Sequence, residues 1–182
     1  MPKRVLVPLA MGCEELEAVT IIDLLRRAEI EVVVAGLENG VVTASRGVRL
    51  VPDTTLDEAL KQDFDMVALP GGLPGSDHLA ADERIGEILR KMNDSGKFVG
   101  AVCAAPKVLV RRGILDGKSA TAYPGVLNAE NHPDIRSEAV IRDGMVITSR
   151  SAGTVMDFAL ELIEALNGRE NRLAVEKSLE RS

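Results

Sequence analysis

The chain contains 182 residues, which is the length of one domain and is enough to bury a hydrophobic core without disulfides. Acidic residues outnumber basic ones by 28 to 22, and aromatic residues make up only 2%, so neither a phosphate-binding surface nor a base-stacking platform for nucleic acid is predicted. Two cysteines, Cys13 and Cys103, are too few for a disulfide framework and favour a reducing compartment, so we expect the cytoplasm.

The predicted elements begin with a strand at residues 4–10, because this apolar run is too short for a signal-peptide core or a membrane span. Short runs rich in Val, Ile and Leu then alternate with longer amphipathic stretches. In chain order the patterns predict a helix at 14–28, a strand at 30–36, a hairpin at 40–53, a short helix at 55–62 capped by Thr54 or Thr55, a strand at 65–72, a long helix at 76–93, a strand at 97–102, a helix at 104–112, a hairpin at 139–149 around Asp143-Gly144 and a helix at 152–166.

Strands that are apolar on both faces and alternate with helices predict one α/β domain over residues 1–182, with a doubly wound, mostly parallel sheet covered by helices on both faces. Residues 169–182 are a charged tail that we expect to be helical. In such folds ligands bind beyond the carboxyl ends of the strands, so the positions to inspect follow Ala10, Leu69 and Val102.

Cys103 lies between a predicted strand and a predicted helix. A nucleophile on a sharp strand-to-helix turn needs small residues two positions before and after it, and Ala101 and Ala105 occupy these positions. Pro106 suits a first helical turn, where its missing N–H costs nothing. The helix N-terminus would then lower the pKa of the thiol. A buried cysteine that only packs as a small hydrophobic residue fits the same spacing.

Gly71 and Gly72 follow another strand, in the sequence Leu-Pro-Gly-Gly. They form either an ordinary turn or a place where the backbone approaches a ligand closely. In the second case the N–H of Gly72 could pair with that of Ala104 as an oxyanion hole.

Glu14, Glu15 and Glu17 open the first predicted helix, where negative charge is favoured in any case. The functional alternative is that one of these carboxyl groups turns back into the crevice at the strand ends. Beside a thiolate it would be held protonated, would donate a hydrogen bond to sulfur and could carry protons during catalysis.

The two histidines are not placed near Cys103 by the sequence. His78 lies in a predicted helix and His132 in a polar loop, so we expect both on the surface and no Cys/His dyad. The alternative is that the loop folds His132 over the site. Cys13 is either a packed loop residue or a resolving thiol for an oxidised Cys103. No cluster has metal-ligand spacing, so we expect neither a metal nor a cofactor.

Five segments together resemble the DJ/ThiJ/PfpI superfamily, and within it the branch that contains the parkinsonism-associated protein deglycase and its bacterial ThiJ-like relatives. The segments are RVLVPLAMGCEELEAV, DMVALPGG, AVCAAP, TAYPG and VITSRSAGTVMDFALELIEALNG. The resemblance covers residues 3–168, in register apart from a loop near residues 128–137.

The resemblance implies a flavodoxin-like fold, a homodimer and a nucleophilic Cys103 that is easily oxidised to sulfinic acid. It implies that Glu15 is the protonated carboxyl hydrogen-bonded to the sulfur, and that Gly72 and Ala104 provide the N–H groups around it, next to Gly71. Arg46 matches a family arginine near the dimer interface.

Two residues depart from the family pattern. The peptidase and amidase branches have a His directly after the Cys, whereas this chain has Ala104, which argues against a protease. The deglycase branch usually has a His before the Pro of the TAYPG segment, and this chain has Tyr123, which can donate a hydrogen bond but is a poor base at neutral pH.

Two classes of function are therefore expected. The first is a cofactor-independent deglycase or glyoxalase in which Cys103 attacks methylglyoxal, glyoxal or their early adducts, as protection against carbonyl and oxidative stress. The second is a non-catalytic redox sensor or chaperone in which oxidation of Cys103 to sulfinate alters a partner function. A third class, a cysteine peptidase or amidase, is disfavoured by Ala104. The expected partners are small aldehydes or glycated groups and a second copy of the chain, with no membrane.

Overall fold

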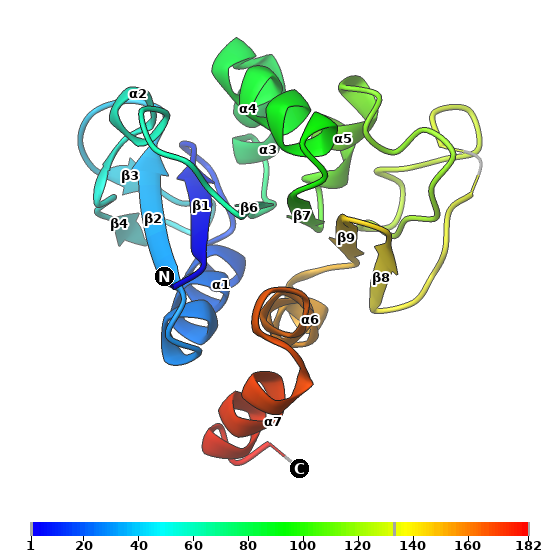
Figure 1. Cartoon of the computed structure of the whole chain (residues 1–182). Helices are drawn as coiled ribbons and strands as arrows, with labels where there is room; N and C mark the ends of the chain where they lie inside the picture. The colour runs from blue at the N-terminus through cyan, green and yellow to red at the C-terminus, as the bar shows by residue number, and fades with distance from the viewer. Residues whose placement is uncertain (1, 133, 182) are drawn as a thin grey trace.

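A seven-stranded sheet forms the centre of the molecule, and helices cover both of its faces (Figure 1). The computed structural model describes residues 2–132 and 134–181. The strand order is β5-β2-β1-β6-β7-β9-β8, and all neighbouring strands are parallel except β8 and β9. The predicted doubly wound, mostly parallel sheet is therefore confirmed.

The strands of this sheet are β1 (Arg4–Leu9), β2 (Glu31–Gly36), β5 (Thr54–Thr55), β6 (Met66–Leu69), β7 (Phe98–Val102), β8 (Val140–Asp143) and β9 (Val146–Ser149). A separate antiparallel hairpin contains β3 (Val42–Thr43) and β4 (Arg49–Leu50). The helices are α1 (Glu15–Arg27), α2 (Leu56–Ala59), α3 (Gly75–Ala81), α4 (Glu83–Asp94), α5 (Pro106–Arg111), the 3₁₀ helix η1 (Ala152–Thr154), α6 (Val155–Asn167) and α7 (Arg169–Ser178).

Alternation along β1 divides the hydrophobic core into two layers. Val5 and Val7 pack with the buried residues of α1 and α6, whereas Leu6 packs with those of α3, α4 and α5 on the opposite face. These β1 side chains are fully buried. Burial on both faces explains why the strand sequences are apolar nearly throughout.

The single long helix predicted at residues 76–93 is wrong. Asp82 adopts an extended conformation that ends α3, and its side chain accepts the N–H of Arg84 at 2.9 Å, which caps α4. An aspartate can satisfy a free helix N–H in this way, so it separates two helices as readily as it continues one. Thr55, one of the two residues expected to cap α2, accepts the N–H of Glu58 and is the cap.

The charged segment after α6 forms α7, which lies against α6 on the side of the molecule away from α3–α5 (Figure 1). Gly168 joins the two helices with a φ of 87°, a conformation that glycine adopts without strain. Arg172 of α7 binds Glu161 and Glu164 of α6 at 3.0 and 2.8 Å. Among the described helices, none combines the length and the apolar character needed to cross a bilayer.

Candidate active site

Cys103 occupies the turn between β7 and α5 in a left-handed backbone conformation, with a φ of 61°. This conformation is uncommon for a residue with a side chain, so it needs support from the surroundings. The N–H of Cys103 donates to Ser149 O at 3.0 Å, and its carbonyl accepts the N–H of Tyr123 at 2.8 Å. Ala101 and Ala105, the small residues two positions away on either side, are completely buried.

The Gly-Gly turn after β6 lies directly against Cys103. A Cβ atom on Gly71 would lie 2.7 Å from the Cβ of Cys103 and 2.6 Å from Oε2 of Glu17. Gly72 has a φ of 89°, and a Cβ there would lie 2.3 Å from the N of Glu14. Both glycines are therefore required for this close approach, which an ordinary surface turn would not need.

Two backbone N–H groups, those of Gly72 and Ala104, interact with the sulfur of Cys103 and favour its ionised form. They come from two different strand ends, one after β6 and one after β7, which meet at the same edge of the sheet. N–H groups from two strand ends thus lie around the sulfur of Cys103.

Glu17 is the carboxyl group beside the sulfur, and the assignment of this position to Glu15 is wrong. The Glu17 carboxyl interacts with the Cys103 thiol, and its Oε2 accepts the N–H of Gly71 at 2.8 Å. The side chain is completely buried, and Oε1 has no hydrogen-bond partner among the described residues. Burial raises the pKa of Glu17 from 4.5 to about 7, so the carboxyl is protonated in a large part of the population near neutral pH.

Glu15 points to the β3–β4 hairpin instead. Its carboxylate accepts the N–H of Arg46 at 2.9 Å, the N–H of Val48 at 3.3 Å and the hydroxyl of Ser45 at 3.1 Å. Desolvation opposes its ionisation, but these hydrogen bonds together lower its pKa. Residues two positions apart on an α-helix are about 200° apart around its axis, so Glu15 and Glu17 face different surroundings.

The expected lowering of the Cys103 pKa is also wrong. Burial, the charge of Glu17 and its hydrogen bond raise the pKa of the thiol to about 12, against the opposing effect of the N–H groups of Gly72 and Ala104. When Glu17 is protonated, the repulsion disappears and its O–H can donate to the sulfur. Cys103 and Glu17 therefore titrate as a coupled pair.

A cavity of about 450 Å³ opens over this pair. It is bounded by the turn that follows β3, by the segment around Tyr123 and by η1. Its lining residues are Glu14, Glu17, Ser45, Arg46, Gly72, Leu73, Cys103, Ala104, Tyr123, Val126, Ser151, Ala152 and Gly153. Arg46 and Tyr123 thus lie at the cavity together with Cys103, Gly72 and Ala104, and the side chains of Arg46 and Tyr123 are exposed.

Neither histidine lines this cavity. His78 is exposed, as expected, with Nδ1 3.0 Å from Met11 O, but His132 is only 4% exposed, so its expected surface position is wrong. Cys13 is completely buried, and desolvation together with the charge of Glu15 raises its pKa to about 11, which suits a packed residue. Within residues 2–132 and 134–181, no group of three or more His, Cys, Asp or Glu side chains could hold a metal ion.

Two features of the site were missed in the sequence. Glu17 shares the helix face of Ile21 and Leu24, at spacings of four and seven residues, and this periodicity would have predicted a buried carboxyl. Ser45 hydrogen-bonds to both Glu14 and Glu15, at 2.9 and 3.1 Å, and no local pattern indicates that contact.

Comparison with known proteins gives this arrangement a context. The family model described as "DJ-1/PfpI family" matches residues 3–165. The chain belongs to the DJ-1/PfpI family. It is 43% identical to protein dj-1beta of Drosophila melanogaster over 98% of this chain and 97% of that protein. It is 35% identical to the glutathione-independent glyoxalase DJR-1.2 of Caenorhabditis elegans over 91% of this chain and 89% of that one.

Among solved structures, the crystal structure of Drosophila melanogaster DJ-1beta superposes with a TM-score of 0.94 at 41% identity, covering 100% of both chains. This likeness confirms the expected family and its flavodoxin-like, single-domain α/β fold. The Caenorhabditis elegans relative carries the name of a glyoxalase.

Proposed function

We propose that this DJ-1/PfpI protein is a cofactor-independent glyoxalase or deglycase that acts on methylglyoxal, glyoxal and their early adducts through Cys103 and Glu17. The observation that carries the proposal is the coupled pair formed by the Cys103 thiol and the buried Glu17 carboxyl. The name of the Caenorhabditis elegans relative, a glutathione-independent glyoxalase, supports the same reaction class.

The reaction begins when the Cys103 thiolate adds to the aldehyde carbon of methylglyoxal. The carbon–sulfur bond forms and the aldehyde oxygen becomes an oxyanion, which the N–H groups of Gly72 and Ala104 stabilise before it takes a proton from Glu17. The resulting carboxylate of Glu17 then removes the hydrogen on that carbon as a proton, which gives an enediolate. Glu17 returns this proton to the neighbouring carbon, while the proton on the former aldehyde oxygen passes to the neighbouring oxygen, and a thioester of lactate results.

Water completes the cycle by attacking the thioester, releasing lactate and restoring the thiol. The sum is methylglyoxal plus water to lactate, with no external oxidant or reductant. A group whose pKa lies near 7 suits both directions of proton transfer, and burial raises the pKa of Glu17 to about 7. An early adduct on an amine would follow the same path, with the amine leaving when sulfur replaces it.

The test is to incubate the purified chain and its Cys103→Ser variant with methylglyoxal and follow lactate by NMR. We expect lactate from the unmodified chain and at least a hundredfold less from the variant, because the nucleophile is removed. Equal rates from both proteins would exclude the thiol mechanism.

A second candidate function uses the same atoms without turnover. Sulfinate formed from Cys103 would be held by the N–H groups of Gly72 and Ala104 and by the O–H of a protonated Glu17, so oxidation could serve a sensor or chaperone role. Absence of lactate together with Cys103 sulfinate at low peroxide, detected by mass spectrometry, would favour this function. A peptidase or amidase is disfavoured further because neither histidine lines the cavity.

We also infer that the working unit is a homodimer in the reducing cytoplasm, where both cysteines stay free. Exposed apolar side chains on α1 and α6 support a self-association surface. Leu16 and Val19, three residues apart on one face of α1, are 51% and 47% exposed, and Met156 of α6 is 45% exposed. Sedimentation velocity tests this inference directly, and a monomer at micromolar concentration would contradict it.

A further inference from the structure

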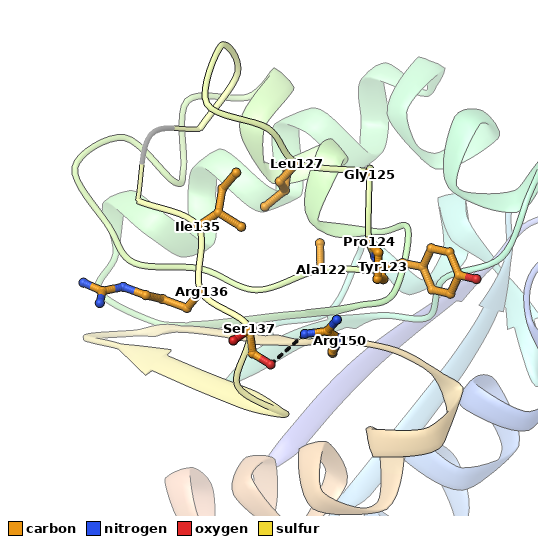
Figure 2. Close-up of a pocket in the computed structure, with 9 residues that line it drawn as sticks. All are labelled: Ala122, Tyr123, Pro124, Gly125, Leu127, Ile135, Arg136, Ser137 and Arg150. Carbon is orange, nitrogen blue, oxygen red and sulfur yellow. Dashed lines mark hydrogen bonds between the residues drawn. The ribbon is translucent and has the colours of Figure 1, made fainter.

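A second cavity of about 290 Å³ adjoins the cavity over Cys103 and Glu17, which we call the catalytic cavity. Figure 2 shows the residues that line this second cavity. Its walls come from the segment that follows Thr121, from the segment before β8 and from the end of β9. The lining residues are Ala122, Tyr123, Pro124, Gly125, Leu127, Ile135, Arg136, Ser137 and Arg150. Tyr123 lines both cavities, so the two cavities adjoin at this residue.

Arg150 brings a positive charge to the second cavity. It is partly buried, and its Nη1 donates to Ser137 O at 2.8 Å, as the dashed line in Figure 2 marks. That is the only side-chain hydrogen bond of Arg150 within the described residues, where no carboxylate lies within ion-pair distance of it. A guanidinium has five N–H donors, so most of them remain available to a ligand.

Arg136 is the other cation of this cavity, but its charge is already compensated. Its Nε lies 2.7 Å from Oδ1 of Asp134, and Figure 2 shows its side chain directed away from the other lining residues. Of the two cations that line this cavity, Arg150 therefore supplies the uncompensated charge.

The size of the two cavities also bears on the substrate. The catalytic cavity alone, at about 450 Å³, falls in the range that holds drug-sized ligands and is far larger than a three-carbon aldehyde needs. A longer substrate with its carbonyl at Cys103 would pass Tyr123 and place its far end beside Arg150. Planar, fork-shaped guanidinium groups bind phosphate and carboxylate in a bidentate manner.

We propose that the cavity at Arg150 is an anion subsite, which holds a phosphate or carboxylate group of a carbonyl substrate whose reactive carbon lies at Cys103. This inference extends the proposed function by naming the substrate class, carbonyl compounds with an anionic group at the far end. The anion subsite can be tested without turnover, so its failure is distinguishable from failure of the glyoxalase proposal.

The first experiment measures anion binding to the full chain by NMR, with inorganic phosphate and acetate titrated in separate series. We expect amide shifts at residues 122–127, and about tenfold weaker binding of the preferred anion in Arg150→Met, because a charge-assisted bidentate contact is lost. Arg136→Met is the matched control, since it removes the same formal charge from the same cavity, and its affinity should stay within about twofold. Equal weakening in both variants, or no shifts at 122–127 with either anion, would overturn the proposal.

The second experiment compares kcat/KM for methylglyoxal with kcat/KM for an α-oxoaldehyde that ends in a carboxylate or a phosphate. The preference for the anionic substrate should fall about tenfold in Arg150→Met, mainly through KM, and stay unchanged in Arg136→Met. A preference that is the same in all three proteins would exclude a substrate role for the anion subsite. Absence of turnover with every substrate would count against the proposed reaction, while the titration would still decide on the subsite.

Discussion

The carboxyl group of Glu17 lies beside Cys103 at the Gly71 turn, and the same carboxyl accepts the N–H of Gly71 at 2.8 Å. Glu17 is completely buried and Cys103 is partly buried, so water screens their interaction only weakly. The protonation state of either group therefore changes the acidity of the other. The reactivity of Cys103 therefore depends on the protonation state of Glu17.

Replacing Glu17 by Gln should separate proton transfer from nucleophile activation. Lactate formation should fall about a hundredfold, because an amide cannot carry the proton. Alkylation of Cys103 by iodoacetamide near pH 8 should not slow, because the charge of Glu17 that raises the thiol pKa is gone. If alkylation slows in parallel with lactate formation, Glu17 acts mainly by stabilising the thiolate.

Because of Glu17, the free energy of unfolding should fall as the pH rises. Its pKa is about 7 in the folded chain against 4.5 for the ordinary carboxyl, so its neutral form fits the fold and stability falls between these two values. The loss is on the order of 3 kcal/mol across that window. Urea denaturation from pH 4 to pH 8 measures this loss as the difference in free energy of unfolding between the unmodified chain and Glu17→Gln. Cys103 adds nothing to that difference below its ordinary pKa of 9.0. A difference that stays constant with pH would contradict the raised pKa.

Glu15 should show the opposite dependence. Hydrogen bonds lower its pKa in the folded chain, so its contribution is present above the ordinary value and is lost as the pH falls through the folded value. Glu15→Gln should cost about 1 kcal/mol at pH 7, because donors in the β3–β4 hairpin lose a charged acceptor. The cost, measured by urea denaturation, should shrink at pH 3. A loss of lactate formation as large as in Glu17→Gln would restore Glu15 to the catalytic role that the family resemblance implied.

The sequence did not identify which glutamate lies beside Cys103, because the resemblance implied Glu15 and the structure places Glu17 there. The ends of buried strands are predictable because these strands are apolar runs in the sequence. The predicted ends gave the correct positions of the Gly71 turn and of Cys103. Which of three neighbouring acids turns inward depends on the rotation of α1 about its axis, and α1 is placed by packing against α6. The face shared by Glu17, Ile21 and Leu24 is visible in the sequence, whereas the hairpin that receives Glu15 is brought there by tertiary contacts.

Other differences have the same origin. Asp82 ends one helix and begins another because its side chain accepts the N–H of Arg84, and the apolar periodicity continues across that break. His132 lies in a polar loop, which predicts exposure, yet the loop folds over it and leaves it 4% exposed. Local patterns thus predicted the elements of the sheet, and non-local contacts determined side-chain burial in the loops.

Gly71→Ala should damage the site through sterics alone. The added methyl would lie 2.6 Å from Oε2 of Glu17 and 2.7 Å from the Cβ of Cys103, so one of these groups must move. We expect destabilisation of about 1–3 kcal/mol and a loss of lactate formation of at least tenfold. Gly153→Ala is the control, because Gly153 also lines the catalytic cavity and its added methyl would lie 3.6 Å from Ser151 Oγ, an ordinary contact. Equal effects of the two substitutions would mean that the Gly71 turn tolerates a side chain.

Tyr123 stands where the deglycase branch usually has a histidine, and it lines the catalytic cavity. A phenol has an ordinary pKa near 10 and an imidazole one near 6.5, so only the imidazole exchanges protons readily at neutral pH. Tyr123→His should therefore raise kcat for methylglyoxal about tenfold, with a rate that falls as the pH drops below 6.5.

The side chain of Tyr123 is 52% exposed and the N–H that binds Cys103 O belongs to the backbone, so the substitution should leave the turn intact. Tyr123→Phe controls for the phenol hydroxyl and should change kcat less than threefold if Tyr123 takes no part in proton transfer. A large loss in Tyr123→Phe, or no gain in Tyr123→His, would show that the phenol itself serves the reaction.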